Sequence, residues 1–220
     1  MFYSLKLTEK SNNYILVALC LLLTRCDFDT KAIIYTSDIQ KIQQEQNNIN
    51  IPVIFSFDTL SDKPETQKTL NKINPILREF FPKLTNIQIK NNNLGATTYM
   101  HMQIPFSTHD LQTPIYFLLQ NHSLYLQIKP DIISKLQTKL QQFNPMITIE
   151  NNHIQANIQN DTNHSVTIQT HHSFLNNKAI AKLSINKLKQ GQSLSIDLSD
   201  VDNSSSMAGN KTLVAFIEID

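Results

Sequence analysis

The sequence contains few of the residues that form covalent cross-links and phosphate-binding loops. Of its 220 residues only two are cysteine and three are glycine, and tryptophan is absent. Both cysteines, Cys20 and Cys26, lie near the N-terminus, so residues 27–220 can hold no disulfide, thiol nucleophile or Cys-ligated zinc. Glycine-rich phosphate loops, dinucleotide-binding fingerprints and the zinc-protease motif H-E-x-x-H are absent as well, which excludes the chemistry that those motifs support.

Positive and negative side chains are nearly equal in number. The chain has 19 Lys and Arg against 18 Asp and Glu, a formal net charge of +1. No block of five or six like charges occurs along it. Because proteins that bind nucleic acid usually carry a basic patch or stripe, we expect no nucleic-acid partner.

One apolar run stands out, "YILVALCLLLT" at residues 14–24. As a helix it would be about 16 Å long, too short for a hydrocarbon core of about 30 Å. Lys6 and Lys10 precede it, so the order is that of a secretory signal peptide, with a basic start and a short apolar centre. An uncleaved short anchor and a buried helix are the alternatives, although a buried helix would show polar positions every three or four residues.

The end of this run, "LTRC" at residues 23–26, resembles the processing site of a bacterial lipoprotein. It departs from that site at Arg25, where the signal peptidase usually requires Gly, Ala or Ser. A rival site, "VALC" at residues 17–20, would leave an apolar centre of about six residues. We therefore predict a lipoprotein signal peptide at residues 1–25 and lipidation of Cys26. The mature protein would then face the periplasm, in either the inner or the outer membrane.

Residues 26–145 mix strand-like and helix-like patterns. Alternating apolar residues predict strands at 31–35, 49–57 and 84–90. Helical spacing predicts one helix that begins after Asp62 and a second that begins at Pro130. Pro75, inside the first of these helices, is expected to kink or split it. This part is expected to be a mixed α/β domain.

From residue 146 onward short alternating runs follow one another, separated by polar turns at intervals of about 8–12 residues. This spacing is typical of a β-sandwich or a small barrel. The predicted fold class is therefore α+β, in which an N-terminal mixed α/β part (residues 26–145) is followed by a C-terminal antiparallel β-sandwich-like part (residues 146–220).

Three histidines, His164, His171 and His172, are the candidate metal ligands. Neutral imidazoles bind zinc and copper well. Adjacent residues of a strand point to opposite faces, however, so His171 and His172 cannot both bind one metal ion without a bulge. No acidic or thiol ligand lies at a fixed spacing beside them, and we expect surface histidines and no metal or other cofactor.

Two polar segments could carry chemistry. Ser107, His109 and Asp110 are close in sequence, but a hydrolytic triad is assembled from distant segments, with its Ser on a strained turn near oxyanion donors. The acidic segment from Asp197 to Ser206 could bind calcium, but its spacing differs from the EF-hand pattern. We interpret both segments as loops and expect no enzyme activity.

An apolar pocket is a further hypothesis, because several aromatic residues occur at strand or helix spacing. Such residues are more often part of a core than of a pocket. The aromatic residues considered for this pocket are Phe80, Phe81, Tyr99, Tyr116, Phe117 and Tyr125.

Several segments, taken in order, are similar to those of a known group of proteins. They are "LLLTRCDF", "YTSDIQ", "IPVIFSF", "HSLYLQI", "IQNDTNHSVTIQTHHSFLNNKAI" and "LKQGQSLSIDLSDV". Together they resemble a family of uncharacterised lipoproteins encoded on prophages and other mobile elements of Gram-negative bacteria. The resemblance implies export and an N-terminal lipid, and it implies no catalytic residues. Members often have further cysteines after the first strand, and this chain has none, so a shared disulfide is not implied.

These observations lead to two functional hypotheses. The first is a lipid-anchored envelope protein that acts by non-catalytic protein–protein interaction, as the exclusion or assembly lipoproteins of mobile elements do. Its partners would be the membrane, through the lipid on Cys26, and an envelope protein. The alternative is a periplasmic module that binds a small ligand or a metal ion.

Overall fold

The computed structural model describes residues 28–45, 47–143, 149, 152–171, 173–180 and 182–219. The predicted signal peptide and Cys26 lie outside the described residues. The secondary-structure elements, in chain order, are β1 (Phe28–Tyr35), α2 (Thr36–Glu45), β2 (Ile49–Thr59), α3 (Lys63–Phe80), β3 (Leu84–Asn91), β4 (Ala96–Ser107), β5 (Ile115–Gln120), β6 (Ser123–Ile128), α4 (Pro130–Gln141), β7 (Asn152–Gln159), β8 (Val166–Thr170), β9 (Ser173–Leu175), β10 (Lys178–Ile180), β11 (Ser184–Leu188), β12 (Ser193–Leu198), α5 (Asp200–Met207) and β13 (Thr212–Ile219).

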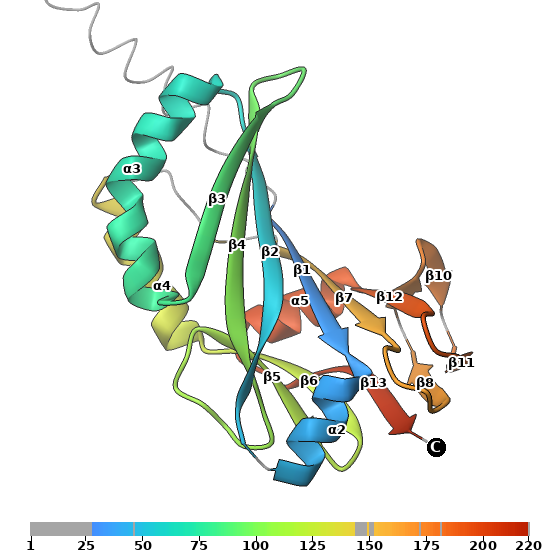
Figure 1. The fold of residues 1–220 in the computed structure, drawn as a ribbon. Helices are drawn as coiled ribbons and strands as arrows, with labels where there is room; N and C mark the ends of the chain where they lie inside the picture. The colour runs from blue at the N-terminus through green and yellow to red at the C-terminus, as the bar shows by residue number, and fades with distance from the viewer. Residues whose placement is uncertain are drawn as a thin grey trace, which may run out of the picture.

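All thirteen of these strands belong to one curled sheet (Figure 1). Its order is β10-β9-β12-β7-β1-β2-β4-β5-β6-β13-β8-β11, and β3 pairs with β4 beside this path. Neighbouring strands are antiparallel except β1 with β7 and β4 with β5, which are parallel. The chain is therefore mostly β, with helices placed around a single sheet.

This sheet contradicts the predicted fold class. The prediction of a separate β-sandwich-like part at residues 146–220 was wrong, because β7 pairs with β1 along its whole length and β13 pairs with β6. The strands from before residue 145 thus form the middle of one hydrogen-bonded sheet, and strands from after it continue that sheet on both sides. Alternation along a strand shows which face is buried, but it does not show which strand is the partner.

The long helices form where the sequence patterns predicted them. The N-cap of α3 is Asp62, whose side chain accepts a hydrogen bond of 3.0 Å from the backbone N–H of Glu65. Pro75 does not split this helix, which is continuous from Lys63 to Phe80. Leu70, Ile73 and Leu77 form its buried face, and α4 begins at Pro130 as expected.

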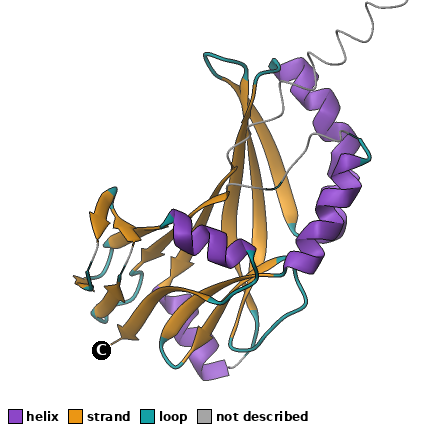
Figure 2. Cartoon of the chain, turned by 180° about the vertical axis from the view of Figure 1, so that it is seen from behind, coloured by secondary structure: helices purple, strands orange, loops and turns teal. Residues whose placement is uncertain are grey.

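Helices α3 and α4 pack against each other and lie over one face of the sheet near β2, β3 and β4 (Figure 2). Helix α5 contacts β6, β7, β12 and β13, and α2 contacts β1. The buried apolar side chains form one cluster that runs from α4 to β13. The molecule therefore has a continuous core, one end of which lies under the two long helices.

Candidate ligand cavity

A cavity of about 170 Å³ lies between the sheet and the helices α3 and α4. Strands β1, β2 and β4 contribute its sheet wall, which includes Val53, Met100 and Met102. The helix wall includes Ile73 of α3 and Leu136 of α4. All five of these side chains are at most 8% exposed, so the walls are made of the same residues that form the core.

The space follows from how the two layers meet. The sheet curls, whereas α3 runs as one helix over its concave side (Figures 1 and 2). A helix cannot follow that curvature, so the aliphatic side chains of the two layers do not meet everywhere. Protein interiors otherwise contain few voids larger than a water molecule. An apolar cavity of about 150 Å³ in another protein stays dry and binds benzene, and this one is of similar size.

Polar groups in the lining are paired with one another. The hydroxyls of Thr59 and Thr66 lie 2.9 Å apart, and the Thr30 hydroxyl donates to Asn152 Oδ1 at 2.8 Å. Among the described residues, the buried side-chain polar atoms without a hydrogen-bond partner belong to six residues outside the lining: Asn74, Thr98, Asn157, Thr170, Ser173 and Asn203. The cavity wall therefore leaves no buried polar group that requires a polar ligand.

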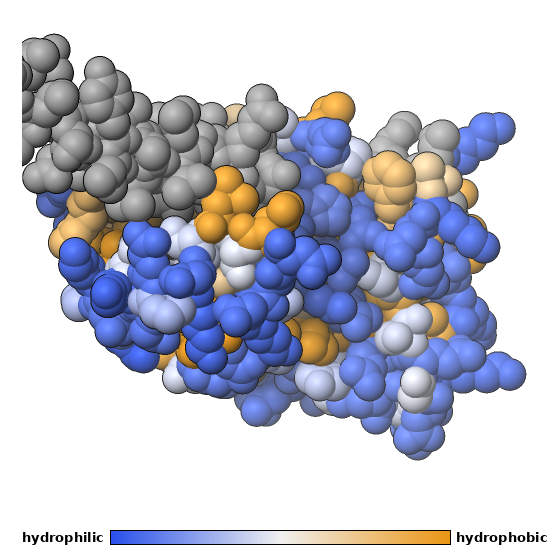
Figure 3. Space-filling model, turned by 90° about the horizontal axis from the view of Figure 1, so that it is seen from above, coloured by the Kyte–Doolittle hydropathy of each residue, from blue (hydrophilic) through white to orange (hydrophobic). Residues whose placement is uncertain are grey.

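Aromatic rings stand at one end of the cavity. Phe28 of β1 pairs in register with Phe57 of β2, and its ring centroid lies 5.7 Å from that of Phe57 and 5.2 Å from that of Phe55. All three rings are half-buried. At the same end Glu65 is half-buried and Thr69 is exposed, so the lining reaches the surface there. Figure 3 looks down on this end, where apolar side chains gather between largely hydrophilic surroundings.

The two covering helices are joined by an ion pair on their outer side. Lys139 Nζ of α4 lies 2.6 Å from Glu79 Oε2 of α3 and 5.7 Å from the centroid of the Phe80 ring. The two side chains are 41% and 54% exposed, and an exposed pair of this kind contributes at most about 1 kcal/mol. The helices are therefore held on the sheet mainly by their buried aliphatic faces.

Of the aromatic residues proposed from sequence, Phe81 lines the cavity and the other five do not. Tyr116 and Phe117 are fully buried core residues. Sequence reasoning missed the ring cluster of Phe28, Phe55 and Phe57. The alternation of residues 49–57 placed the last two on one face of a strand, but nothing in it showed that a cavity faces them.

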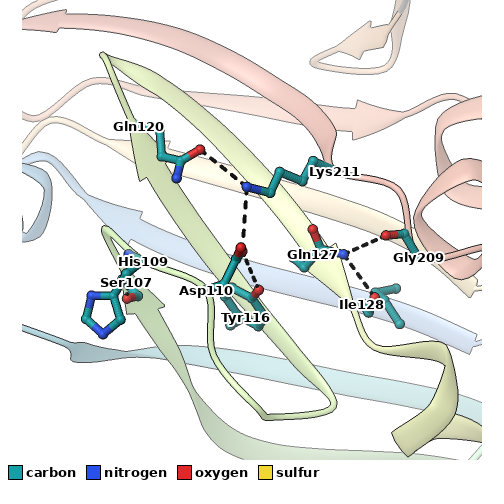
Figure 4. A network of polar contacts seen from close by, with 9 residues as sticks. All are labelled: Ser107, His109, Asp110, Tyr116, Gln120, Gln127, Ile128, Gly209 and Lys211. Carbon is teal, nitrogen blue, oxygen red and sulfur yellow. Dashed lines mark hydrogen bonds and ion pairs between the residues drawn. The ribbon is translucent and has the colours of Figure 1, made fainter.

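Ser107, His109 and Asp110 do not form a hydrogen-bonded triad in the described structure (Figure 4). The Ser107 hydroxyl accepts from the backbone N–H of His109 at 3.0 Å, and Asp110 accepts from the Tyr116 hydroxyl at 3.0 Å. That bond, together with nearby Lys211, lowers the pKa of Asp110, while burial raises the pKa of Tyr116 to about 12. These groups tie the loop before β5 to the sheet.

The acidic segment from Asp197 to Ser206 is not a loop, contrary to expectation. Asp197 is buried at the end of β12, where it accepts from Gln155 Nε2. Ser199 then caps α5, and its hydroxyl accepts from the backbone N–H of Asp202 at 3.2 Å. The spacing of Ser199 and Asp202 is that of a capping box, which was the signal available in the sequence.

The predicted histidines are not brought together with other ligands. His164 is exposed in the loop after β7, and His171 lies beside β9. His172 lies outside the described residues. The part of the chain that the structure describes contains no group of three or more His, Cys, Asp and Glu side chains placed to hold a metal ion.

The comparisons with known proteins give a family. Residues 28–219 match a family model described as a domain of unknown function (DUF7424). The chain therefore belongs to this family, whose domain covers the whole sheet. No curated protein and no solved structure matches the chain. None of the helices in the described ranges is long and apolar enough to cross a membrane.

Proposed function

We propose that this protein is a non-catalytic binding module that takes a small apolar molecule, or the hydrocarbon end of an amphiphile, into the cavity under α3 and α4. The observation that carries the proposal is a cavity with a predominantly apolar wall. Every buried polar side-chain atom of that wall already has a hydrogen-bond partner. A site of this composition rejects polar molecules, which would lose their hydration without gaining hydrogen bonds.

The size of the cavity limits the enclosed part of the occupant to a ring of about the size of benzene or a short stretch of chain, and the rest of a larger molecule would lie at the open aromatic end. Burial of one methylene group contributes about 0.8 kcal/mol. A chain that buries five or six such groups gains about 4–5 kcal/mol, which corresponds to a Kd on the order of 1 mM to 0.1 mM before contacts at the aromatic end are added.

The proposal includes attachment to the cell envelope through a lipid on Cys26. The apolar run at residues 14–24, with Lys6 and Lys10 before it, supports export, and the resemblance to lipoproteins of mobile elements supports the lipid. Phe28 follows Cys26 by two residues, a reach of at most about 7 Å. Anchorage would thus hold the aromatic end of the cavity close to the bilayer, where apolar molecules accumulate.

Binding is tested with the purified full chain in a fluorinated surfactant, a detergent class that mixes poorly with hydrocarbon. The probe is 1-aminoanthracene, an uncharged aromatic molecule whose fluorescence rises in an apolar site. Val53 lines the cavity and Val166 does not, although both are buried strand residues. We expect Val53→Phe to fill the cavity and to abolish the fluorescence increase.

Val166→Phe is the matched control, because the same enlargement at a packed position should cost about 1–3 kcal/mol of unfolding free energy while leaving probe binding intact. Loss of binding in both variants, or in neither, would contradict the assignment of the cavity as the site. No binding by the unmodified protein would overturn the proposal.

Attachment is tested separately by the mass of the N-terminal peptide from protein in its own envelope. An acylated glyceryl group on Cys26 is expected, and it should be lost in Cys26→Ser. A peptide that begins at Met1 with unmodified Cys26 would contradict the anchor without affecting the cavity.

A protein partner in the envelope is a second candidate function. It is favoured by exposed apolar side chains at the other end of the molecule, where Val201 of α5 and Phe174 of β9 line a shallow groove and are 78% and 42% exposed. A photo-crosslinking amino acid at Val201 should give a discrete adduct in the envelope, whereas one at the exposed Ser204 of the same helix should not. Equal labelling from both positions would contradict this interface.

A further inference from the structure

We infer that the molecule bound in the cavity carries an uncharged or cationic head group, and not a carboxylate or a phosphate. The inference deepens the proposed function and rests on it. It follows from the kinds of polar side chain that line the cavity and from their position at its aromatic end.

Glu65 is the one ionisable side chain among the described residues that line the cavity. The other polar lining residues are uncharged, and they are Thr30, Thr59, Ser61, Thr66, Thr69 and Asn152. Lys63 and Lys68, on the same helix as Glu65, are exposed and do not belong to the lining. A carboxylate or phosphate at the cavity mouth would therefore meet a negative charge, and no cation among the described lining residues.

The N-terminus of α3 lies at the same end, and the positive end of a helix dipole would by itself favour an anion. Here that end is already occupied by acidic side chains. Asp62 accepts from the backbone N–H of Glu65 at 3.0 Å, and its carbonyl accepts from the N–H of Thr66 at 2.9 Å. One carboxylate thus lies at the N-cap and another in the first turn, so the helix end does not act as an anion site.

The same groups suit two other kinds of head group. An ammonium group can pair with the Glu65 carboxylate, and a hydroxyl-bearing head can exchange hydrogen bonds with the hydroxyls of Ser61 and Thr69 at the mouth. The hydrocarbon chain would then extend past Phe57 towards Ile73. This arrangement matches the division of the lining into a polar end and an apolar interior.

The test is displacement of 1-aminoanthracene from the full chain by three amphiphiles with the same six-carbon chain, a length that the cavity can enclose, each below its micelle concentration at pH 8. Hexylamine is cationic, 1-monohexanoylglycerol is uncharged and hexanoate is anionic. We expect the amine and the glyceride to displace the probe at concentrations about tenfold lower than hexanoate, and Glu65→Lys to reverse the order of amine and hexanoate.

Glu65→Gln should remove the advantage of the amine and leave that of the glyceride. Glu45→Lys, the control, makes the same charge change as Glu65→Lys at an exposed position outside the lining and should leave the order unchanged. If hexanoate displaces the probe as well as the others, or if Glu65→Lys changes nothing, the head-group inference is overturned while binding stands. If the protein binds neither the probe nor any amphiphile, the proposed function itself fails.

Discussion

Buried polar side chains find their hydrogen-bond partners in different ways at the two ends of the sheet. At the helix-covered end, formed by β1, β2, β4, α3 and α4, the polar side chains of the lining pair locally and leave an apolar hollow. At the strand-rich end, formed by β7, β8, β12, β13 and α5, a buried amide, Asn160, joins distant segments to one another. The comparison shows that the polar groups of one end leave a hollow between the layers, whereas those of the other end connect segments that are distant in the sequence.

Asn160 connects four parts of the chain. Its Oδ1 accepts from the Thr36 hydroxyl at 2.9 Å, and its Nδ2 donates to the carbonyls of His164 and Leu188 at 2.8 and 3.0 Å. The residue is fully buried. Because a buried group that loses its partner costs about 1–3 kcal/mol, this one side chain has a large influence on the strand-rich end.

The largest expected effect is therefore that of Asn160→Ala, which should lower the free energy of unfolding by about 3–5 kcal/mol in urea denaturation. Asn157→Ala is the matched control on the same strand segment, because the Oδ1 of Asn157 has no hydrogen-bond partner. Its effect should stay below about 1 kcal/mol. Equal losses in the two variants would contradict the role assigned to the Asn160 hydrogen bonds.

Glycine-to-alanine replacements compare the two ends, because Gly95 lies between β3 and β4 and Gly191 lies between β11 and β12. A Cβ atom on Gly95, at the tip of the β3–β4 hairpin, would lie 2.1 Å from the carbonyl oxygen of Thr59, which is a backbone atom and cannot rotate away. A Cβ on Gly191 meets nothing within 4 Å, although its φ of +78° disfavours a side chain. We expect thermal unfolding to show a loss of about 2–3 kcal/mol for Gly95→Ala and about 1 kcal/mol for Gly191→Ala.

The backbone shift forced by Gly95→Ala would reach Thr59, whose hydroxyl pairs with Thr66 beside the cavity. Probe binding should therefore weaken in Gly95→Ala and stay unchanged in Gly191→Ala. The reverse pattern would show that the two ends are not independent.

The smallest of these effects concerns Asp161, which caps α2 from the loop after β7. Burial alone would raise its pKa, but hydrogen bonds from the Ser37 side chain and backbone and from the Thr36 hydroxyl together lower it below the ordinary 3.8. A lowered carboxyl pKa stabilises the fold above the ordinary pKa, and that contribution is lost as the pH falls through the folded-state pKa.

Asp161→Asn should accordingly lower the free energy of unfolding by about 1 kcal/mol at pH 7, a value limited by the exposure of the side chain. Burial, and then repulsion from Asp161, raise the pKa of Asp38, so relief of that repulsion further limits the loss. The difference between the two proteins should shrink as the pH falls below about 3.8. A difference that is constant from pH 7 to pH 3 would exclude this electrostatic contribution.

Local patterns predicted the elements well and their assembly poorly. The cap at Asp62 and the start at Pro130 were confirmed, because both depend on neighbouring residues. Tertiary packing decides the end of α4, where Leu136 and Leu140 are buried but Phe143, just after the helix, is 53% exposed. The prediction of a loop from Asp197 to Ser206 was wrong, because it overlooked that the spacing of Ser199 and Asp202 is that of a helix cap.

An apolar pocket was a hypothesis, but apart from Phe81 its lining could not be predicted, because a residue that lines a void has the same sequence pattern as one that packs against a neighbour. Val53 and Val166 are both buried apolar positions of alternating strands. Only the tertiary structure places Val53 beside the cavity and Val166 in packed core. The ring cluster depends likewise on the pairing of Phe28 with Phe57 across two strands.

The sequence by itself determined where several strands form, where the long helices begin, and that the chain has no cysteine beyond Cys26 with which to build a disulfide. These properties follow from side-chain periodicity and composition, which are local. The tertiary structure alone decided that β1 lies between β2 and β7, that one sheet spans both halves of the chain, and that a hollow remains beneath α3 and α4. Those features arise from pairing and curvature between separate segments, of which β1 and β7 are more than a hundred residues apart, and the chain carries no local signal for them.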